Sequence, residues 1–133
     1  MIRGSCLCGA VAFAANDLSG PIAHCHCHTC RKAHGAAFAT TARVDRAHFS
    51  WTRSEDTLRH YESSPGKLRH FCGRCGTHLM AEWIDAPAVI LRLGALDDDP
   101  GGRPAVHIWT SHEVPWLDYG ADLPRLPEGR RGP

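Results

Sequence analysis

The sequence predicts a small, mainly β fold in which metal ions hold short sheets together. Three observations lead to this prediction. Gly and Pro divide the 133-residue chain into short segments. Most of these segments alternate in polarity or carry β-branched and aromatic residues, and they lack the sustained 3.6-residue period of a long helix. Seven cysteines fall into three close clusters, a pattern typical of metal ligands.

The length favours a single domain over residues 1–133, with a partly irregular tail after about residue 118. Strands are expected at residues 10–14, 37–44, 58–62, 67–71, 77–83, 89–93 and 106–109. Ser-Ser-Pro-Gly at 63–66 is expected to form a four-residue turn. Few short helical turns are expected, and only residues 30–35 look like the start of one. Asp-Asp-Asp-Pro-Gly-Gly at 97–102 is expected to be a loop.

Charge and hydropathy exclude two classes of partner. The chain has 15 Lys and Arg against 14 Asp and Glu, without a dense basic block, so nothing indicates nucleic-acid binding. The best apolar stretch, residues 86–91, contains Pro87 and is followed by Arg92, well short of the ~20 residues of a membrane span. No secretory signal is evident, so a cytoplasmic location and a small-molecule partner are expected. The oligomeric state is left open.

Two of the cysteine clusters together predict one closed, structural zinc site. Seven is an odd number, and in a reducing compartment close cysteines bind metals more often than they form disulfides. In C-G-R-C-G at 72–76 the two sulfurs face one point, and Gly76 accepts the positive φ that closes the turn. A closed tetrahedral site needs four ligands, and we assign to it Cys6, Cys8, Cys72 and Cys75. Iron, or simple burial of the thiols, is the alternative.

The third cluster has only three cysteines, Cys25, Cys27 and Cys30, in the pattern C-x-C-x-x-C. Catalytic zinc sites use three protein ligands and leave one position for water or substrate, whereas structural sites are closed by four. An open second site is therefore predicted, which makes two zinc ions in all. A histidine could close it instead, and His34 has the freest reach because His26 lies between two ligands. An empty or oxidised site is the third alternative.

An open zinc with three thiolate ligands suits thiol chemistry. Such a zinc is soft enough to bind a further sulfur, and a substrate thiol bound there would lose its proton and stay nucleophilic. The expected reaction is addition of that sulfur to a small carbonyl carbon, or the reverse cleavage of a carbon-sulfur bond. His28 and His34 are candidates for proton transfer. Arg31 and Lys32 are candidates for binding a substrate carboxylate, with a solvated surface role as the alternative.

Four segments resemble one known family. GSCLCGAVAF at 4–13, CHCHTCRK at 25–32, FCGRCGTHL at 71–79 and HIWTSHEVPWLDYGADLPRLPE at 107–128 are similar, in this order, to the glutathione-dependent formaldehyde-activating enzyme family, which includes the centromere protein V domain. The resemblance implies a β fold of small sheets like that of the Rab GTPase exchange chaperone. It also implies the same division of the cysteines into a structural and a catalytic zinc site.

Two hypotheses about function follow. The family's founding activity joins formaldehyde to glutathione, and in reverse it is classed as a carbon-sulfur lyase acting on S-(hydroxymethyl)glutathione. The first hypothesis is therefore a zinc-dependent carbon-sulfur lyase that acts on a small thiol-aldehyde adduct. The second is a non-catalytic, zinc-stabilised binding or protein-interaction module in which the second site is closed.

Overall fold

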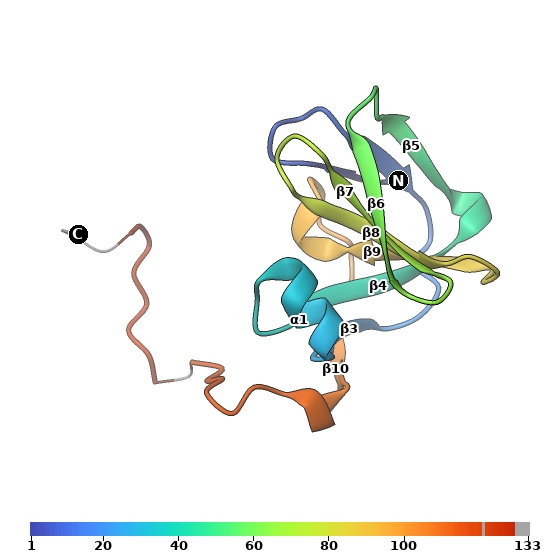
Figure 1. Ribbon diagram of the computed structural model, residues 1–133. Helices are drawn as coiled ribbons and strands as arrows, with labels where there is room; N and C mark the ends of the chain where they lie inside the picture. Colours follow the sequence, from blue (N-terminus) through green and yellow to red (C-terminus); the bar gives the residue numbers. More distant parts are fainter. Residues whose placement is uncertain (121, 130–133) are drawn as a thin grey trace.

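The computed structural model describes residues 1–120 and 122–129 and consists mainly of strands in two sheets (Figure 1). The smaller sheet has three antiparallel strands in the order β1-β2-β5. These strands are β1 (Ile2–Ser5), β2 (Ala12–Ala15) and β5 (Phe49–Arg53). The mainly β class predicted from the short alternating segments is confirmed.

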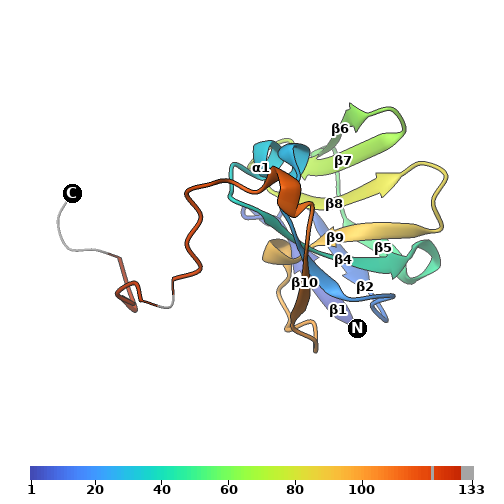
Figure 2. The ribbon, with the colours of Figure 1, turned by 90° about the horizontal axis from the view of Figure 1, so that it is seen from below.

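The larger sheet has seven strands in the order β10-β3-β4-β9-β8-β7-β6, with β10 and β6 at its two ends (Figure 2). Its strands are β3 (Ile22–Cys25), β4 (Ala39–Asp45), β6 (Leu58–Ser64), β7 (Lys67–Cys72), β8 (His78–Trp83), β9 (Ala88–Arg92) and β10 (Pro104–Ile108). Neighbouring strands are antiparallel except for β10, which pairs with β3 in parallel.

Helical structure is short. The α-helix is α1 (His28–His34), and three 3-10 turns are η1 (Arg46–His48), η2 (Leu93–Ala95) and η3 (Thr110–His112). Helix α1 begins where the Cys27 sulfur accepts a hydrogen bond from the Cys30 amide, so a cysteine takes the place of the usual oxygen cap. Within the described residues, none of the helices has the length and apolar character needed to cross a membrane.

The hydrophobic core lies between the two sheets. Phe13 of β2 is 1% exposed, and its ring centroid lies 5.5 Å from that of Phe49 and 6.3 Å from that of Trp51, both on β5. Val44 of β4 and Leu91 of β9 enter the same cluster from the larger sheet. One face of the larger sheet is therefore used for core packing, and the other face is free for different side chains.

The opposite face of the larger sheet carries polar side chains and is partly covered by α1. Directly paired residues of neighbouring strands share a face, as do residues two apart on one strand. Cys25 pairs with Ala39, and Arg92 pairs with Thr41, two residues further along β4. Register therefore places a cysteine and a buried arginine on this surface, which we call the α1 face.

All seven predicted strands overlap strands of the structure, but β1, β3 and β5 were not predicted. Strand β1 has only four residues and contains Gly4, and β3 runs directly into the cysteine motif. In β5 the aromatic residues are separated by serine and followed by Thr52 and Arg53, so the segment shows little bias toward burial. Each is held by pairing with a partner strand rather than by its own pattern.

The turn predicted at 63–66 is shorter than expected. Strand β6 runs to Ser64, which pairs with Lys67, so only Pro65 and Gly66 connect β6 to β7. Gly66 has a φ of 82°, which a residue without a Cβ adopts readily. The predicted loop at 97–102 contains no helix or strand and is confirmed.

After η3 the described residues of the chain form no helix or strand and run away from the sheets (Figure 1). Tyr119, near the end of the described chain, still contacts residues that precede this segment. Its hydroxyl donates a hydrogen bond to Glu113 at 2.8 Å and lies 3.4 Å from His26 Nε2. Of the expected tail, residues 121 and 130–133 lie outside the described residues.

Gly4 of β1 leaves no room for a side chain. A Cβ there would meet the Phe13 ring, with Cε1 at 2.5 Å, and the Ala95 carbonyl oxygen at 2.9 Å. We expect Gly4→Ala to lower the free energy of unfolding by about 1–3 kcal/mol because the buried ring has to shift. Urea denaturation measures this, with Gly94→Ala as the control, since a Cβ at Gly94 meets nothing within 4 Å. Equal stability of the two variants would contradict the prediction.

Candidate metal centres

The first cysteine cluster joins the two sheets. Cys6 and Cys8 follow β1, Cys72 ends β7, and Cys75 lies in the turn before β8. The four sulfurs lie within 4.8 Å of one another, and Cys8 Sγ is 3.7 Å from the sulfurs of both Cys6 and Cys72. A tetrahedral zinc with bonds of about 2.3 Å separates its sulfurs by about 3.8 Å. The four sulfurs therefore fit one tetrahedral metal ion.

Backbone and hydroxyl donors surround these sulfurs. The amides of Arg74 and Cys75 donate to Cys72 Sγ at 3.4 and 3.5 Å. The hydroxyl of Thr77 lies 3.3 Å from Cys75 Sγ, and this contact together with the Thr77 amide lowers the pKa of Cys75 to about 5. Such donors stabilise thiolates, which are the form of cysteine that binds a metal ion.

Two glycines allow the chain to turn around this cluster. Gly76 has a φ of 80° and Gly9 a φ of 81°, both in the left-handed region. The Gly76 amide donates to the Cys72 carbonyl at 2.8 Å and closes the turn. The positive φ predicted for Gly76 is present, and a side chain at either glycine would strain the backbone.

The second cysteine cluster lies on the α1 face of the larger sheet. Cys25 is the last residue of β3, Cys27 caps α1, and Cys30 lies in the first turn of the helix. Their sulfurs lie within 4.8 Å of one another, and among the described residues the group contains no histidine or carboxylate. The structure therefore brings the three cysteines of the C-x-C-x-x-C motif together around one point.

Two arginines are buried beside the second cluster. Arg69 of β7 is 2% exposed and Arg92 of β9 is 4% exposed. The Nη1 and Nη2 atoms of Arg69 lie 3.8 and 3.9 Å from Cys30 Sγ, and Nη2 also donates to Thr29 Oγ1 at 2.7 Å. Buried guanidinium groups need nearby negative charge, and among the described residues neither forms an ion pair with a carboxylate. Thiolates supply that charge, so this environment fits a metal bound by cysteines.

The electrostatics of the cluster favour a thiolate at Cys30. The hydrogen bond from the Cys25 thiol, followed by the charge of Arg92, lowers the pKa of Cys30 to about 4. The pKa of Cys25 is raised because its thiol is the donor in that hydrogen bond and is partly buried. This arrangement therefore favours negative charge on Cys30 over Cys25, next to both arginines.

The second cluster faces a cavity of about 790 Å³. All three of its cysteines line the cavity. Small, hydroxyl-bearing and aliphatic residues also line it, together with aromatic and basic residues that include His28, Arg43, Lys67, Trp83, Arg92 and Trp109. A cavity of this size accommodates a small organic ligand or a short peptide.

His28, a candidate for proton transfer, lines this cavity. Arg31 Nη2 lies 2.6 Å from His28 Nδ1, and the His28 ring stacks on His112 with 4.5 Å between centroids. A guanidinium group only donates hydrogen bonds, so Nδ1 is the acceptor and the ring proton of His28 is on Nε2. Arg31 therefore fixes the tautomer of this histidine and leaves an N–H donor at Nε2.

Two other candidate residues on α1, Lys32 and His34, are not among the described residues that line this cavity. His34 packs against His78, with 4.9 Å between ring centroids. Burial, followed by the charge of Arg92, lowers the pKa of His34 to about 4, so its ring is neutral at pH 7. Lys32 lines a neighbouring cavity of about 420 Å³. Among His28, Arg31, Lys32 and His34, the described lining of the cysteine cavity includes only His28.

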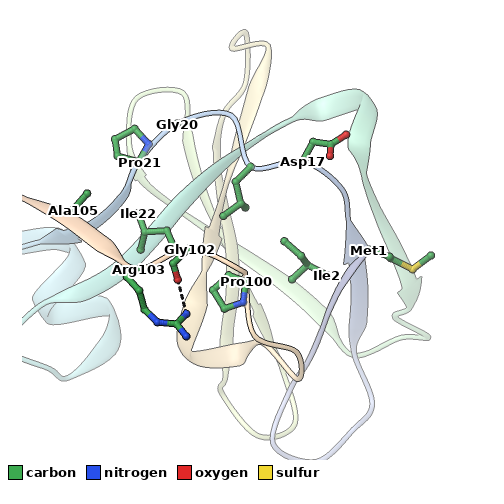
Figure 3. A pocket seen from close by; sticks show the side chains of 11 residues that line it. Met1, Ile2, Asp17, Gly20, Pro21, Ile22, Pro100, Gly102, Arg103 and Ala105 are labelled. Atoms are coloured by element: carbon green, nitrogen blue, oxygen red, sulfur yellow. Dashed lines mark hydrogen bonds between the residues drawn. The ribbon is translucent and has the colours of Figure 1, made fainter.

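A further cavity, of about 480 Å³, adjoins the cysteine cavity at Gly20 and Pro21 (Figure 3). Its described lining includes no cysteine. Arg103 lines it and donates to the Gly102 carbonyl at 2.7 Å, and its other partner is Asp99 at 2.9 Å. The charge of Arg103 is thus already compensated, and this cavity offers no candidate site.

Sequence reasoning missed three basic residues beside the second cluster, Lys67, Arg69 and Arg92. Arg69 contacts Cys30 although the two are 39 residues apart in sequence. One signal was available for Arg92, because it stands in the apolar segment VILRL, where a charged residue needs a partner. Arg69 stands between other polar residues in KLRHF, which gives no such signal. The identity of that partner depends on strand order, which the segments themselves do not specify.

Fold and site together define a class of protein. It is a small, mainly β protein in which four cysteines that could hold one metal ion join two sheets, and three cysteines that could hold another line a cavity on the α1 face.

The chain belongs to the glutathione-dependent formaldehyde-activating enzyme family, as the resemblance of its motifs implied. The model of that family matches residues 1–112, which contain all seven cysteines. A Halomonas elongata protein, provisionally named as a glutathione-dependent formaldehyde-activating enzyme, is 31% identical in an alignment 130 residues long, and this alignment covers 89% of this chain and 80% of that protein. A solved Rhodobacter sphaeroides protein has a similar fold, with a TM-score of 0.64 and 21% identity over 79% of this chain and 98% of its own.

Proposed function

We propose that this protein is a zinc-dependent carbon-sulfur lyase of the glutathione-dependent formaldehyde-activating type. Its substrates would be a small thiol such as glutathione and a small aldehyde such as formaldehyde. Beside family membership, one observation carries the proposal: three cysteines converge on the wall of a cavity large enough for a peptide thiol. We assign a catalytic zinc to Cys25, Cys27 and Cys30, and a structural zinc to Cys6, Cys8, Cys72 and Cys75.

The reaction forms or breaks one carbon-sulfur bond. Zinc in the second cluster would lower the pKa of a substrate thiol, so that its sulfur is nucleophilic at neutral pH. In the forward direction the sulfur adds to the carbonyl carbon, the π bond of the carbonyl breaks, and its electrons go to the oxygen. The proton lost from the sulfur is balanced by a proton gained at that oxygen. The reverse reaction cleaves the same bond with the opposite proton movements.

We assign to His28 the role of hydrogen-bond donor to the carbonyl oxygen of the aldehyde. Its Nδ1 is occupied by Arg31, so Nε2–H is the group that it offers to a ligand in the cavity. A hydrogen bond from Nε2 stabilises negative charge as it develops on the oxygen. Arg31 then acts as a positioning residue for His28, and Arg69 adds to the groups that stabilise the Cys30 thiolate.

Exchange NMR tests the proposal. Zinc-loaded protein is expected to accelerate the exchange of ¹³C-labelled formaldehyde hydrate with its glutathione adduct by about a hundredfold or more over glutathione alone. The exchange rate is measured at equilibrium by ¹³C exchange spectroscopy. The Leu7→Ala variant serves as a control, since Leu7 is 88% exposed and lies outside the cavity.

The same preparation distinguishes the enzyme from a binding module. Cobalt in the second cluster is expected to change its absorption spectrum when glutathione is added, because a fourth sulfur joins the metal. Protein that neither accelerates exchange with any small thiol nor shows this spectral change would contradict the lyase proposal. It would support a non-catalytic module with a closed second site.

A further inference from the structure

The wall of the cysteine cavity carries an excess of positive charge. Arg43, Lys67 and Arg92 line it, and its described lining includes no aspartate or glutamate. The three cations come from different strands, β4, β7 and β9. On β4 and β9, Arg43 pairs with Ile90 two residues before Arg92, so both arginines lie on the α1 face.

Arg92 is the most buried of these three cations. It is 4% exposed, and its Nη2 is buried without a hydrogen-bond partner among the described residues. Burial lowers the pKa of Arg92, and the nearby charge of Cys30 opposes this shift. Buried donors in folded proteins are almost always paired. Arg92 therefore retains a donor for a group that enters the cavity.

The charges around the second cluster do not balance. A zinc ion with three thiolates has one net negative charge, whereas the buried Arg69 and Arg92 bring two positive charges. With a thiolate as the fourth ligand, zinc and its four sulfurs carry two negative charges, which balance the two positive charges of Arg69 and Arg92. The charge of Lys67 is then still uncompensated, which favours a ligand with a second anionic group.

Lys67 is placed to receive such a group. Its Nζ lies 5.2 Å from the centroid of the Trp83 ring, and Trp83 is 44% exposed, so this part of the wall is open to solvent. Among the described residues Lys67 has no carboxylate partner. Lys67 as a whole is half-buried and burial lowers its pKa, so an anion that binds there meets a partly desolvated charge.

We infer that Arg92 and Lys67 form a carboxylate-binding subsite that holds the acidic part of the thiol whose sulfur reaches the three cysteines. The inference rests on the proposed function in one respect, namely that the ligand is a thiol. The excess of positive charge on the cavity wall is independent of that function. Arg92 and Lys67 thus replace Arg31 and Lys32 as the candidates for binding the carboxylate, because Arg31 contacts His28 and Lys32 lines the neighbouring cavity. Arg92 supplies planar paired donors, and Lys67 supplies a point charge.

Two thiols that differ in one carboxylate test the subsite. Zinc-loaded protein is titrated calorimetrically with N-acetylcysteine and with N-acetylcysteine amide, and the ratio of the two dissociation constants is compared between variants. We expect Lys67→Met and Arg92→Gln each to reduce the relative preference for the acid by about tenfold or more. Arg92→Lys keeps the charge and is expected to retain part of the preference. The control is Arg103→Gln, which removes a charge whose side chain is 74% exposed and lies outside this cavity.

The outcomes separate the subsite from the lyase proposal. If both thiols bind and the ratio is unchanged in Lys67→Met and Arg92→Gln, the inference is wrong although the proposed function survives. It is also wrong if Lys32→Met removes the preference instead. If no thiol binds, S-methylglutathione and its diethyl ester take their place, since neither has a free thiol. A preference for the acid that depends on Lys67 and Arg92 then supports the subsite and contradicts the lyase, whereas no preference overturns both.

Discussion

Replacing Cys72 with serine is expected to release one metal ion per chain and to unfold both sheets. Cys72 is fully buried at the end of β7, and its cluster ties that strand to the loop after β1. Structural zinc sites bind with about 10–16 kcal/mol, which is as large as the roughly 5–15 kcal/mol stability of a whole domain. Loss of the metal therefore removes most of the free energy of folding.

Far-UV circular dichroism, amide NMR dispersion and metal content measure this effect. The matched control is Leu7→Ala, which changes an 88% exposed residue between two ligands of the same cluster and should alter stability by no more than about 0.5 kcal/mol. A Cys72→Ser protein that stays folded with two bound ions would show that the first cluster is not the structural site.

Replacing Cys27 with serine is expected to abolish activity while the fold survives. The Cys27 sulfur caps α1 by accepting the Cys30 amide at 3.3 Å, and a serine oxygen is a good cap at the same position. The second metal is lost because a ligand is missing. Replacing a residue that only hydrogen-bonds to a metal ligand already lowers metal affinity or activity by about 10–100-fold. Removal of the ligand itself should therefore reduce the exchange rate by more than about a hundredfold.

A second substitution separates the cap from the metal. Cys27→Ala removes both, so it should match Cys27→Ser in metal content and activity but be less stable by about 1 kcal/mol. Metal analysis, urea denaturation and the exchange assay distinguish the two variants. If Cys27→Ser unfolds the protein as completely as Cys72→Ser does, the division into a structural and a catalytic site is wrong.

The features that could be predicted from the sequence are those determined by neighbouring residues. The motif C-x-x-C-G predicted the left-handed Gly76 because the geometry of such a turn is set within five residues. The cysteine spacing likewise predicted which sulfurs would gather. The short helix at 30–35 was placed two residues late, because its cap is a cysteine and not the serine, threonine, asparagine or aspartate that usually marks a helix start.

The chemistry of the cavity wall depends on strand order and could not be predicted in this way. Arg31 and Lys32 follow the cysteine motif in sequence, and proximity along the chain made them candidates. In the folded protein the cations of the cavity come from β4, β7 and β9, which reach the cysteines only through the pairing of five strands. A single sequence contains no direct signal for that register.

The parallel pairing of β10 with β3 also determines when the cysteine cavity is completed during synthesis of the chain. Ile108 pairs with Cys25 and also lines the cavity, so one wall depends on the last strand. Contacts between distant parts of a chain form late, because a long loop has to close first. All four cysteines of the first cluster have been synthesised by residue 75. Under the proposed assignment, a nascent chain can load its first metal while Cys25, Cys27 and Cys30 are still accessible, and we expect these three thiols to be the ones most open to oxidation before folding ends.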